Sequence, residues 1–226
     1  GTENAWEYFF EQPVGVDLLD IAHSKNVILS WAESPREYPG ADMTINPELY
    51  TMWKAYADQY LRIKPDIQIK IDQTYRELSK DQKMIGVLCR GTDYTKGRPS
   101  RHPIQPDLMD LIRKTDELMT EKQCEFVYLA TEDEDVYELF LKHYKDKLKT
   151  MNMKRFHADE IHNINEALAD QQDNDACQKG IDYLVNIGVL AKCSCLVAGC
   201  AGGTYGALLL TEGYEDTYIF NLGYYP

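Results

Sequence analysis

The chain has 226 residues, of which 44% are hydrophobic and 27% are charged, a balance typical of a globular protein with a sizeable core. Its 37 acidic residues outnumber 24 Lys and Arg residues, and the net charge of -13 repels nucleic acid and anionic membranes, so we expect no nucleic-acid partner. No apolar run reaches the roughly 18 residues of a membrane span, and the N-terminus lacks the regions of a signal peptide. The sequence therefore predicts a cytoplasmic protein without a transmembrane segment.

The N-terminal part begins with Gly1 instead of Met, and we interpret Gly1 as a cloning scar on a fragment that lacks upstream sequence. NVILSW (26–31) is apolar and β-branched, which predicts a strand before the turn residues of ESPREYPG. Asn46 and Pro47 are typical of a helix start, and apolar residues then recur every three to four positions. This amphipathic helix ends near Lys64-Pro65, and a second stretch with helical period follows.

The rest of the chain alternates strand-like and helical runs. The strand-like runs are 84–90, 125–131, 193–199 and 216–223, with MNMKRF (151–156) in the place of a third strand. The helical runs are 107–119, 132–148, 180–192 and 205–212. Nearly continuous apolar strands that alternate with helices favour an α/β fold, with a Rossmann-like parallel sheet covered by helices on both faces.

Candidate ligand-binding residues follow the strands, because open parallel sheets bind ligands beyond the carboxyl ends of their strands. They are Arg90, Gly91, Thr92 and Asp93 after the first strand, Thr131, Glu132 and Asp133 after the second, and Gly199, Gly202, Gly203 and Thr204 after the fourth. The glycine turn lets backbone amides approach an anion, and the helix that follows adds its unpaired N–H groups. The guanidinium of Arg90 suits a diphosphate oxygen.

Each of these signals has a structural alternative. The glycines of AGCAGGTYG also fit a tight strand-to-helix turn, and Arg90 could form an ion pair with Asp93. Thr131, Glu132 and Asp133 could cap the next helix, or a carboxylate among them could accept hydrogen bonds from a ribose hydroxyl or a base.

The sequence predicts no metal site. Three of the six cysteines have the spacing C-x-C-x4-C in KCSCLVAGC, but they lie in an apolar run without a fourth ligand, so we expect buried thiols in a reducing compartment. His157 and His162 in FHADEIH indicate a surface loop.

Three segments resemble the fucosyltransferase superfamily. IGVLCRGTDYTKGRPSRHPI (85–104) resembles the segment IGVHVRRTD…HPI of the α-1,6-fucosyltransferases, the bacterial NodZ-type enzymes and, more distantly, the protein O-fucosyltransferases. VYLATEDEDVYELFLKHY (127–144) is similar to the family's LATDDP segment, and NIGVLAKCSCLVAGCAGGT (186–204) to its D-x-x-LLS-x-C-x-x-LV…SS segment. The likeness runs in order from about Leu61 to Leu210, as in a divergent member of bacterial type.

The resemblance implies the C-terminal, donor-binding half of a metal-independent GT-B glycosyltransferase of polysaccharide biosynthesis, with GDP-fucose as the favoured donor and a glycan as acceptor. Residues 1–60 would be a remnant of the N-terminal region with a linking helix, and residues 61–226 the nucleotide-sugar-binding domain. The resemblance implies that Arg90 neutralises the β-phosphate, that Asp93 orients Arg90, and that Glu132 and Asp133 meet ribose or base. Gly202, Gly203 and Thr204 would contact phosphate, and Thr131 and Asn186 are further candidate donor-binding residues. His102 matches the HPI histidine, which either lines the cleft or holds its loop.

Three positions depart from the family pattern. Cys89 stands where the motif has His, and a thiol is a poor hydrogen-bond donor. Asn186 occupies the position of the family's Asp, and Gly202-Gly203 replaces hydroxyl side chains. These changes bear on the identity of the base and sugar.

The implied chemistry is attack by an acceptor hydroxyl on the anomeric carbon as the nucleoside diphosphate leaves. The candidates for the general base are Glu132, Asp133, Asp93 and His102. Two alternatives stay open: a nucleotide-sugar-binding module without transferase activity, and a Rossmann-like scaffold that recruits a protein partner.

Overall fold

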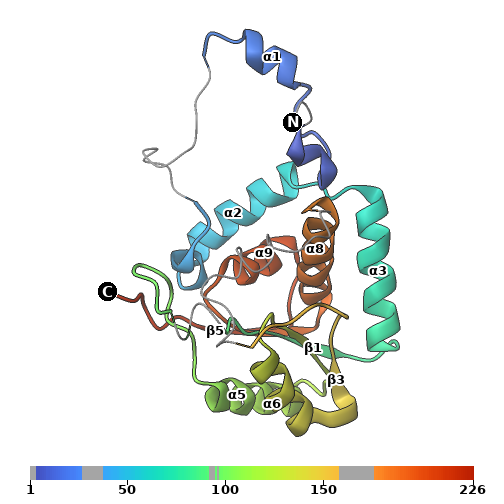
Figure 1. Ribbon diagram of the computed structural model, residues 1–226, viewed down its shortest axis with the longest axis vertical. Coiled ribbons are helices and arrows are strands. Elements are labelled where there is room, and N and C mark those ends of the chain that lie inside the picture. Colours follow the sequence, from blue (N-terminus) through green and yellow to red (C-terminus); the bar gives the residue numbers. More distant parts are fainter. Residues whose placement is uncertain (1–3, 27–37, 92–94, 96, 158–175) are drawn as a thin grey trace.

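The computed structural model describes residues 4–26, 38–91, 95, 97–157 and 176–226 (Figure 1). In this part of the chain five parallel strands form one sheet in the order β3-β2-β1-β4-β5. The strands are β1 (Met84–Leu88), β2 (Phe126–Ala130), β3 (Leu148–Lys149), β4 (Cys195–Gly199) and β5 (Asp216–Phe220). The α/β prediction with a parallel sheet is thus confirmed.

Helices cover both faces of the sheet, which explains why the central strands β1 and β4 are apolar and buried along their whole length. Alternate residues of β1 point to opposite faces: Met84 and Leu88 pack with α3 (Pro65–Ser79), α8 (Ala176–Lys192) and α9 (Gly202–Leu210). Ile85 and Val87 pack with α5 (Leu108–Glu121) and α6 (Glu134–Tyr144). Figure 1 shows these two helical layers on either side of the strands.

The helix starts follow the local sequence. In α2 (Pro47–Tyr60) the side chain of Asn46 accepts hydrogen bonds from the amides of Glu48 and Leu49, as its position before Pro47 predicts. Asp107 and Asp133 cap α5 and α6 in the same way. Four short helices complete the described elements: η1 (Ala5–Tyr8), α1 (Leu18–His23), η2 (Ala41–Thr44) and η3 (Lys145–Lys147). No helix among the described residues is long and apolar enough to cross a membrane.

The third strand differs from the prediction. Its two residues, Leu148 and Lys149, precede MNMKRF, and within 151–156 only Phe156 makes a β-bridge, to Asp133. The run carries polar residues at alternate positions and lies at the sheet edge, where β3 pairs with β2 alone. Residues 27–31 of the predicted strand 26–31 lie outside the described residues, as does His162.

The N-terminal elements share a core with the sheet. Met43 and Ala57 are buried in the same cluster as Leu208 and Leu209 of α9, and the hydroxyl of Tyr50 donates to the carbonyl of Leu208 at 3.2 Å. Figure 1 shows α2 next to α9, whereas α1 projects away from the body of the molecule. The described part of 38–60 therefore packs on the sheet and its helices.

Candidate functional site

Arg90 lies directly beyond β1 and pairs with an acid beyond β2. Its Nε is 3.5 Å from Oε1 of Glu132, and both side chains keep limited exposure, 22% and 17%. The same carboxylate oxygen accepts a hydrogen bond from the amide of Gly91 at 3.2 Å. The pairing of β1 with β2 brings these residues together, because Leu88 is in register with Ala130. Glu132 thus contacts both Arg90 and Gly91 at the edge of the sheet formed by the carboxyl ends of the strands.

Asp133 and Thr131 are buried and make local capping bonds. The carboxylate of Asp133 accepts from the amide of Val136 at 3.1 Å, and its own amide donates to Oγ1 of Thr131 at 3.2 Å. A Cβ on Gly91 would lie 2.1 Å from Oδ2 of Asp133, so only glycine fits at that point of the β1 loop. These bonds agree with the capping interpretation for Thr131 and Asp133, while Glu132 turns toward Arg90.

The glycine turn joins β4 to α9. Gly202 is exposed and has open space where a Cβ would be, whereas a Cβ on Gly203 would lie 2.7 Å from Cδ1 of Leu88. Thr204 is fully buried, and its hydroxyl donates to the carbonyl of Gly199 at 2.6 Å. Ala201 offers no side-chain cap, so the first amides of α9 point beyond the helix without an intrahelical acceptor.

The first turn of α9 and Arg90 share one edge of the sheet. β1 and β4 are parallel neighbours, with Leu88 in register with Ala198, so the chain leaves both strands at the same side. The contact between Gly203 and Leu88 places the glycine turn against the end of β1, two residues before Arg90. The arrangement combines a guanidinium with helix N-terminal amides, which are groups that bind anions.

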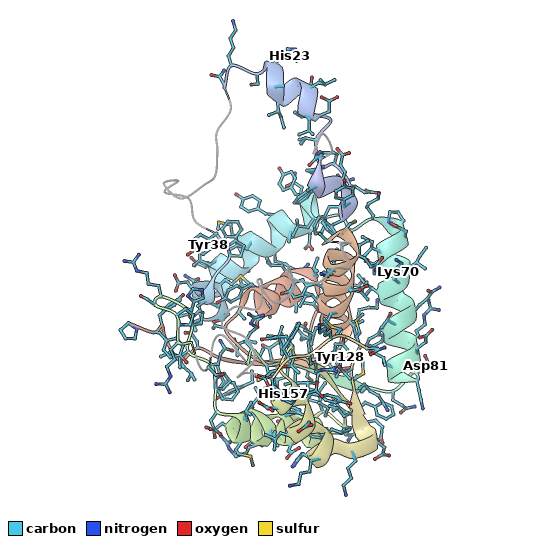
Figure 2. All side chains as sticks on the ribbon, in the orientation of Figure 1. His23, Tyr38, Lys70, Asp81, Tyr128 and His157 are labelled. Carbon is cyan, nitrogen blue, oxygen red and sulfur yellow. The ribbon has the colours of Figure 1, made fainter. Side chains whose placement is uncertain are left out.

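Two other candidate residues have different surroundings. Asn186 is buried in α8, where its Oδ1 accepts a hydrogen bond from the hydroxyl of Tyr128 at 2.5 Å. Tyr128 is labelled inside the molecule in Figure 2, and its Cα is level with Gly86 in the middle of β1. His102 is exposed, and its Nδ1 lies 3.1 Å from the carbonyl of Ser100. Thr92 and Asp93 lie outside the described residues, so the pairing of Arg90 with Asp93 is untested.

Cys89 is buried behind Arg90. Burial, together with the charges of Glu132 and Asp133, raises the pKa of the Cys89 thiol well above its usual range. The other five cysteines form no disulfide bond, and of these only Cys177 is partly exposed. Among the described residues no group of three or more His, Cys, Asp or Glu side chains could hold a metal ion. His157, labelled in Figure 2, pairs instead with Asp135 at 2.9 Å.

One residue beside the glycine turn was missed by the sequence reasoning. Gln105 is 8% exposed, and its Nε2 donates to the carbonyl of Cys200 at 2.9 Å. A polar residue between Ile104 and Pro106 in the otherwise apolar PIQP segment was the available signal, but its contact with the β4 turn depends on tertiary packing.

No protein-family model matches this sequence, and no curated protein matches it. Among solved structures, NodZ alpha-1,6-fucosyltransferase soaked with GDP-fucose is similar at 16% identity and a TM-score of 0.41, over 67% of this chain and 44% of that chain. POFUT1 in complex with GDP is similar at 10% identity and a TM-score of 0.48, over 78% of this chain and 51% of that chain. Fucosyltransferase NodZ from Bradyrhizobium is similar at 14% identity and a TM-score of 0.37, over 61% of this chain and 38% of that chain. The chain thus spans about half or less of the length of these enzymes.

Proposed function

We propose that this chain is the donor-binding part of a glycosyltransferase that moves a sugar from a nucleoside-diphosphate sugar, with GDP-fucose favoured, to a hydroxyl of a glycan or another acceptor. The observation that carries the proposal is the position of Arg90 and the first turn of α9 beyond neighbouring parallel strands. Ligands of open parallel sheets bind at this edge. The sequence motifs, which resemble fucosyltransferases at the same positions, supply the donor class.

In the proposed reaction the acceptor oxygen forms a bond to the anomeric carbon while the bond from that carbon to the diphosphate breaks. The electron pair of the breaking bond stays on the diphosphate, and the acceptor proton passes to a general base. Arg90 and the amides of α9 stabilise the growing negative charge, which in transfer reactions is generally a large catalytic contribution. Glu132 orients Arg90 through the 3.5 Å ion pair. The base comes from Glu132, Asp133, Asp93, His102 or the acceptor-binding part.

A second candidate is a nucleotide-sugar-binding module without transferase activity. The observation that favours it is the burial of Cys89, whose side chain is 3% exposed where the fucosyltransferase motif has a histidine. A buried thiol that stays protonated contributes little to binding a diphosphate.

Thermal-shift measurements with GDP, GDP-fucose, GDP-mannose, UDP and UDP-sugars test the proposal. A ligand at 100 times its dissociation constant stabilises the folded state by about 2.7 kcal/mol, so a specific donor raises the melting temperature clearly. We expect the largest shift from GDP-fucose, followed by transfer or slow donor hydrolysis in the full-length protein. Binding without turnover in that protein supports the module instead. If no nucleoside diphosphate changes the melting temperature, the proposal is wrong and the scaffold alternative gains support.

A further inference from the structure

Gln105 holds the turn between β4 and α9 from the side. Its Nε2 donates to the carbonyl of Cys200 at 2.9 Å and to the carbonyl of Pro103 at 3.3 Å. Both partners are carbonyl oxygens, which only accept hydrogen bonds, so the orientation of the amide is fixed. The side chain is 8% exposed, and its Oε1 accepts no hydrogen bond from a described residue. Gln105 therefore lies in the interior as a double donor to the backbone.

Gly199 makes room for this amide. A Cβ at position 199 would lie 2.3 Å from Oε1 of Gln105 and 2.9 Å from Cδ of Pro106. Real Cβ atoms essentially never make contacts shorter than 3.0 Å, so the absence of a side chain at Gly199 leaves the space that the Gln105 amide fills. The glycine that ends β4 is thus explained by its packing against Gln105.

Both carbonyls that precede Ala201 are occupied by side chains. The carbonyl of Gly199 accepts from the hydroxyl of Thr204, and the carbonyl of Cys200 accepts from Gln105. Ala201, the N-cap of α9, contributes no side-chain bond. The direction in which the first amides of α9 point is therefore set by Thr204 from within the helix and by Gln105 from outside it.

Residues 101–106, here called the strap, carry Gln105 and are anchored on their other side. Ile104 donates its amide to the carbonyl of Gly223 at 2.9 Å, and Tyr225 donates its amide to the carbonyl of His102 at 2.9 Å. Pro103 and Tyr224 complete a short antiparallel pairing with the segment that follows β5. The strap thus links the loop after β1 and the segment after β5 to the turn after β4.

We infer that Gln105 is a positioning residue for phosphate binding: through the carbonyl of Cys200 it fixes the turn that aims the first amides of α9 at the diphosphate. The inference rests on the proposed function and adds a residue that does not itself touch the ligand. The inference also makes the strap part of the binding site. A displacement of the strap would shift the first amides of α9, because the 2.9 Å hydrogen bond from Gln105 to Cys200 connects the strap to the turn.

The test compares Gln105→Met with Gln82→Met, since methionine has similar length and donates no hydrogen bond, and Gln82 is exposed at the opposite end of β1. Calorimetric titrations with GDP and with guanosine separate the phosphate contribution from the nucleoside contribution. We expect Gln105→Met to lower the affinity for GDP about tenfold and to leave the affinity for guanosine unchanged. Gln82→Met should change neither affinity. Faster amide hydrogen exchange should be confined to 199–204. If Gln105→Met does not fold, Gln105→Asn, whose amide is too short to reach Cys200, replaces it.

Three outcomes overturn the inference or its premise separately. Equal GDP affinity in the wild type and the Gln105 variant overturns the inference and leaves the proposed function standing. If the affinities for GDP and guanosine fall equally and amide hydrogen exchange is faster throughout the sheet, the role of Gln105 is merely structural, and this outcome also overturns the inference. If the wild type binds no nucleoside diphosphate at all, the proposed function fails first.

Discussion

Under the proposed function, Arg90 is the residue on which donor binding depends most directly. An arginine guanidinium can present two parallel N–H groups to a phosphate, and a lysine ammonium cannot reproduce that geometry. We therefore expect Arg90→Lys to lower transfer, or donor hydrolysis, by 10²- to 10³-fold, which corresponds to about 3 to 4 kcal/mol. The melting temperature should change little, because lysine keeps a positive charge opposite Glu132.

Arg76→Lys is the matched control for Arg90→Lys. Arg76 is exposed in the last turn of α3, before β1 begins and therefore at the other edge of the sheet. Steady-state kinetics with the full-length protein give the activity, and thermal denaturation gives the stability. Near-normal turnover by Arg90→Lys would remove Arg90 from the proposed mechanism.

Cys89 should make the free energy of unfolding fall as the pH rises in the alkaline range. Burial raises the pKa of its thiol in the folded protein above the unfolded value of about 8.5, so the folded state keeps a proton that the unfolded state loses. The stabilisation is complete below that pH and declines as pH rises above it. We expect Cys89→Ala to reduce the slope of unfolding free energy against pH between about 9 and 10 by up to about 1.4 kcal/mol per pH unit.

Urea denaturation at several pH values measures that slope. Cys177→Ala serves as control, because Cys177 is partly exposed at the start of α8. Cys193 is also buried with a raised pKa and keeps its own share of the pH dependence in both variants. Identical slopes for the wild type and Cys89→Ala would show that the Cys89 thiolate is tolerated in the folded protein.

At the scale of single elements, the two glycines that begin α9 differ in whether they leave space for a side chain. A Cβ on Gly203 would lie 2.7 Å from Leu88 and 3.0 Å from Ile187, whereas Gly202 has open space. We expect Gly203→Ala to lower the free energy of unfolding by about 1 to 3 kcal/mol through overpacking. Gly202→Ala should leave stability unchanged or raise it slightly, because alanine is the better helix former. Chemical denaturation of both variants measures the difference, and equal stabilities would contradict the packing of α9 on β1.

The elements that were predicted correctly are those whose local signals agree with their environment. Asn46 and Pro47 start α2 by bonds within the first turn, so their effect is independent of the rest of the fold. The apolar run of β1 reflects burial on both faces. MNMKRF was misplaced because β3 pairs on one side only and over two residues, and such a short edge strand leaves no hydrophobic period to detect.

At the scale of the whole molecule, parallel topology explains why the placement of the candidate residues could be predicted, while their role in binding stays a prediction. Residues that follow parallel strands lie at the same edge of the sheet, so the common placement of Arg90, Glu132 and the glycine turn was expected without knowledge of the strand order. Side-chain direction could not be predicted in that way. Thr204 turns inward to Gly199, and Asn186 pairs with Tyr128. Both side-chain directions depend on how a helix is rotated against the sheet, which the sequence pattern does not specify. Gln105 was missed because its partner, Cys200, is distant in sequence.

The division of the chain at residue 60 remains a prediction that truncation can test. Met43 and Ala57 are buried against α9, and Tyr50 donates to the carbonyl of Leu208, so the stable unit should extend into α2. Deleting residues 1–60 uncovers this apolar surface, and loss of a buried side chain such as that of Met43 alone costs about 1.5 to 3 kcal/mol. We expect 61–226 to melt about 3 to 12 °C below the intact chain from this loss alone, since about 2 to 4 °C corresponds to 1 kcal/mol in a domain of this size.

Deletion of residues 1–37 is the control for that truncation, because it retains α2 and, of the residues that the structure describes, removes only the partly buried Phe9 from this core cluster. Calorimetry of the three proteins should place 38–226 close to the intact chain and 61–226 far below it. The surface uncovered on α9 belongs to the helix whose first turn lies at the proposed phosphate site, so 61–226 should also lose affinity for GDP. A fragment 61–226 that melts cooperatively at the temperature of the intact chain would show instead that the sheet and its helices form an independent domain, to which α2 merely adheres.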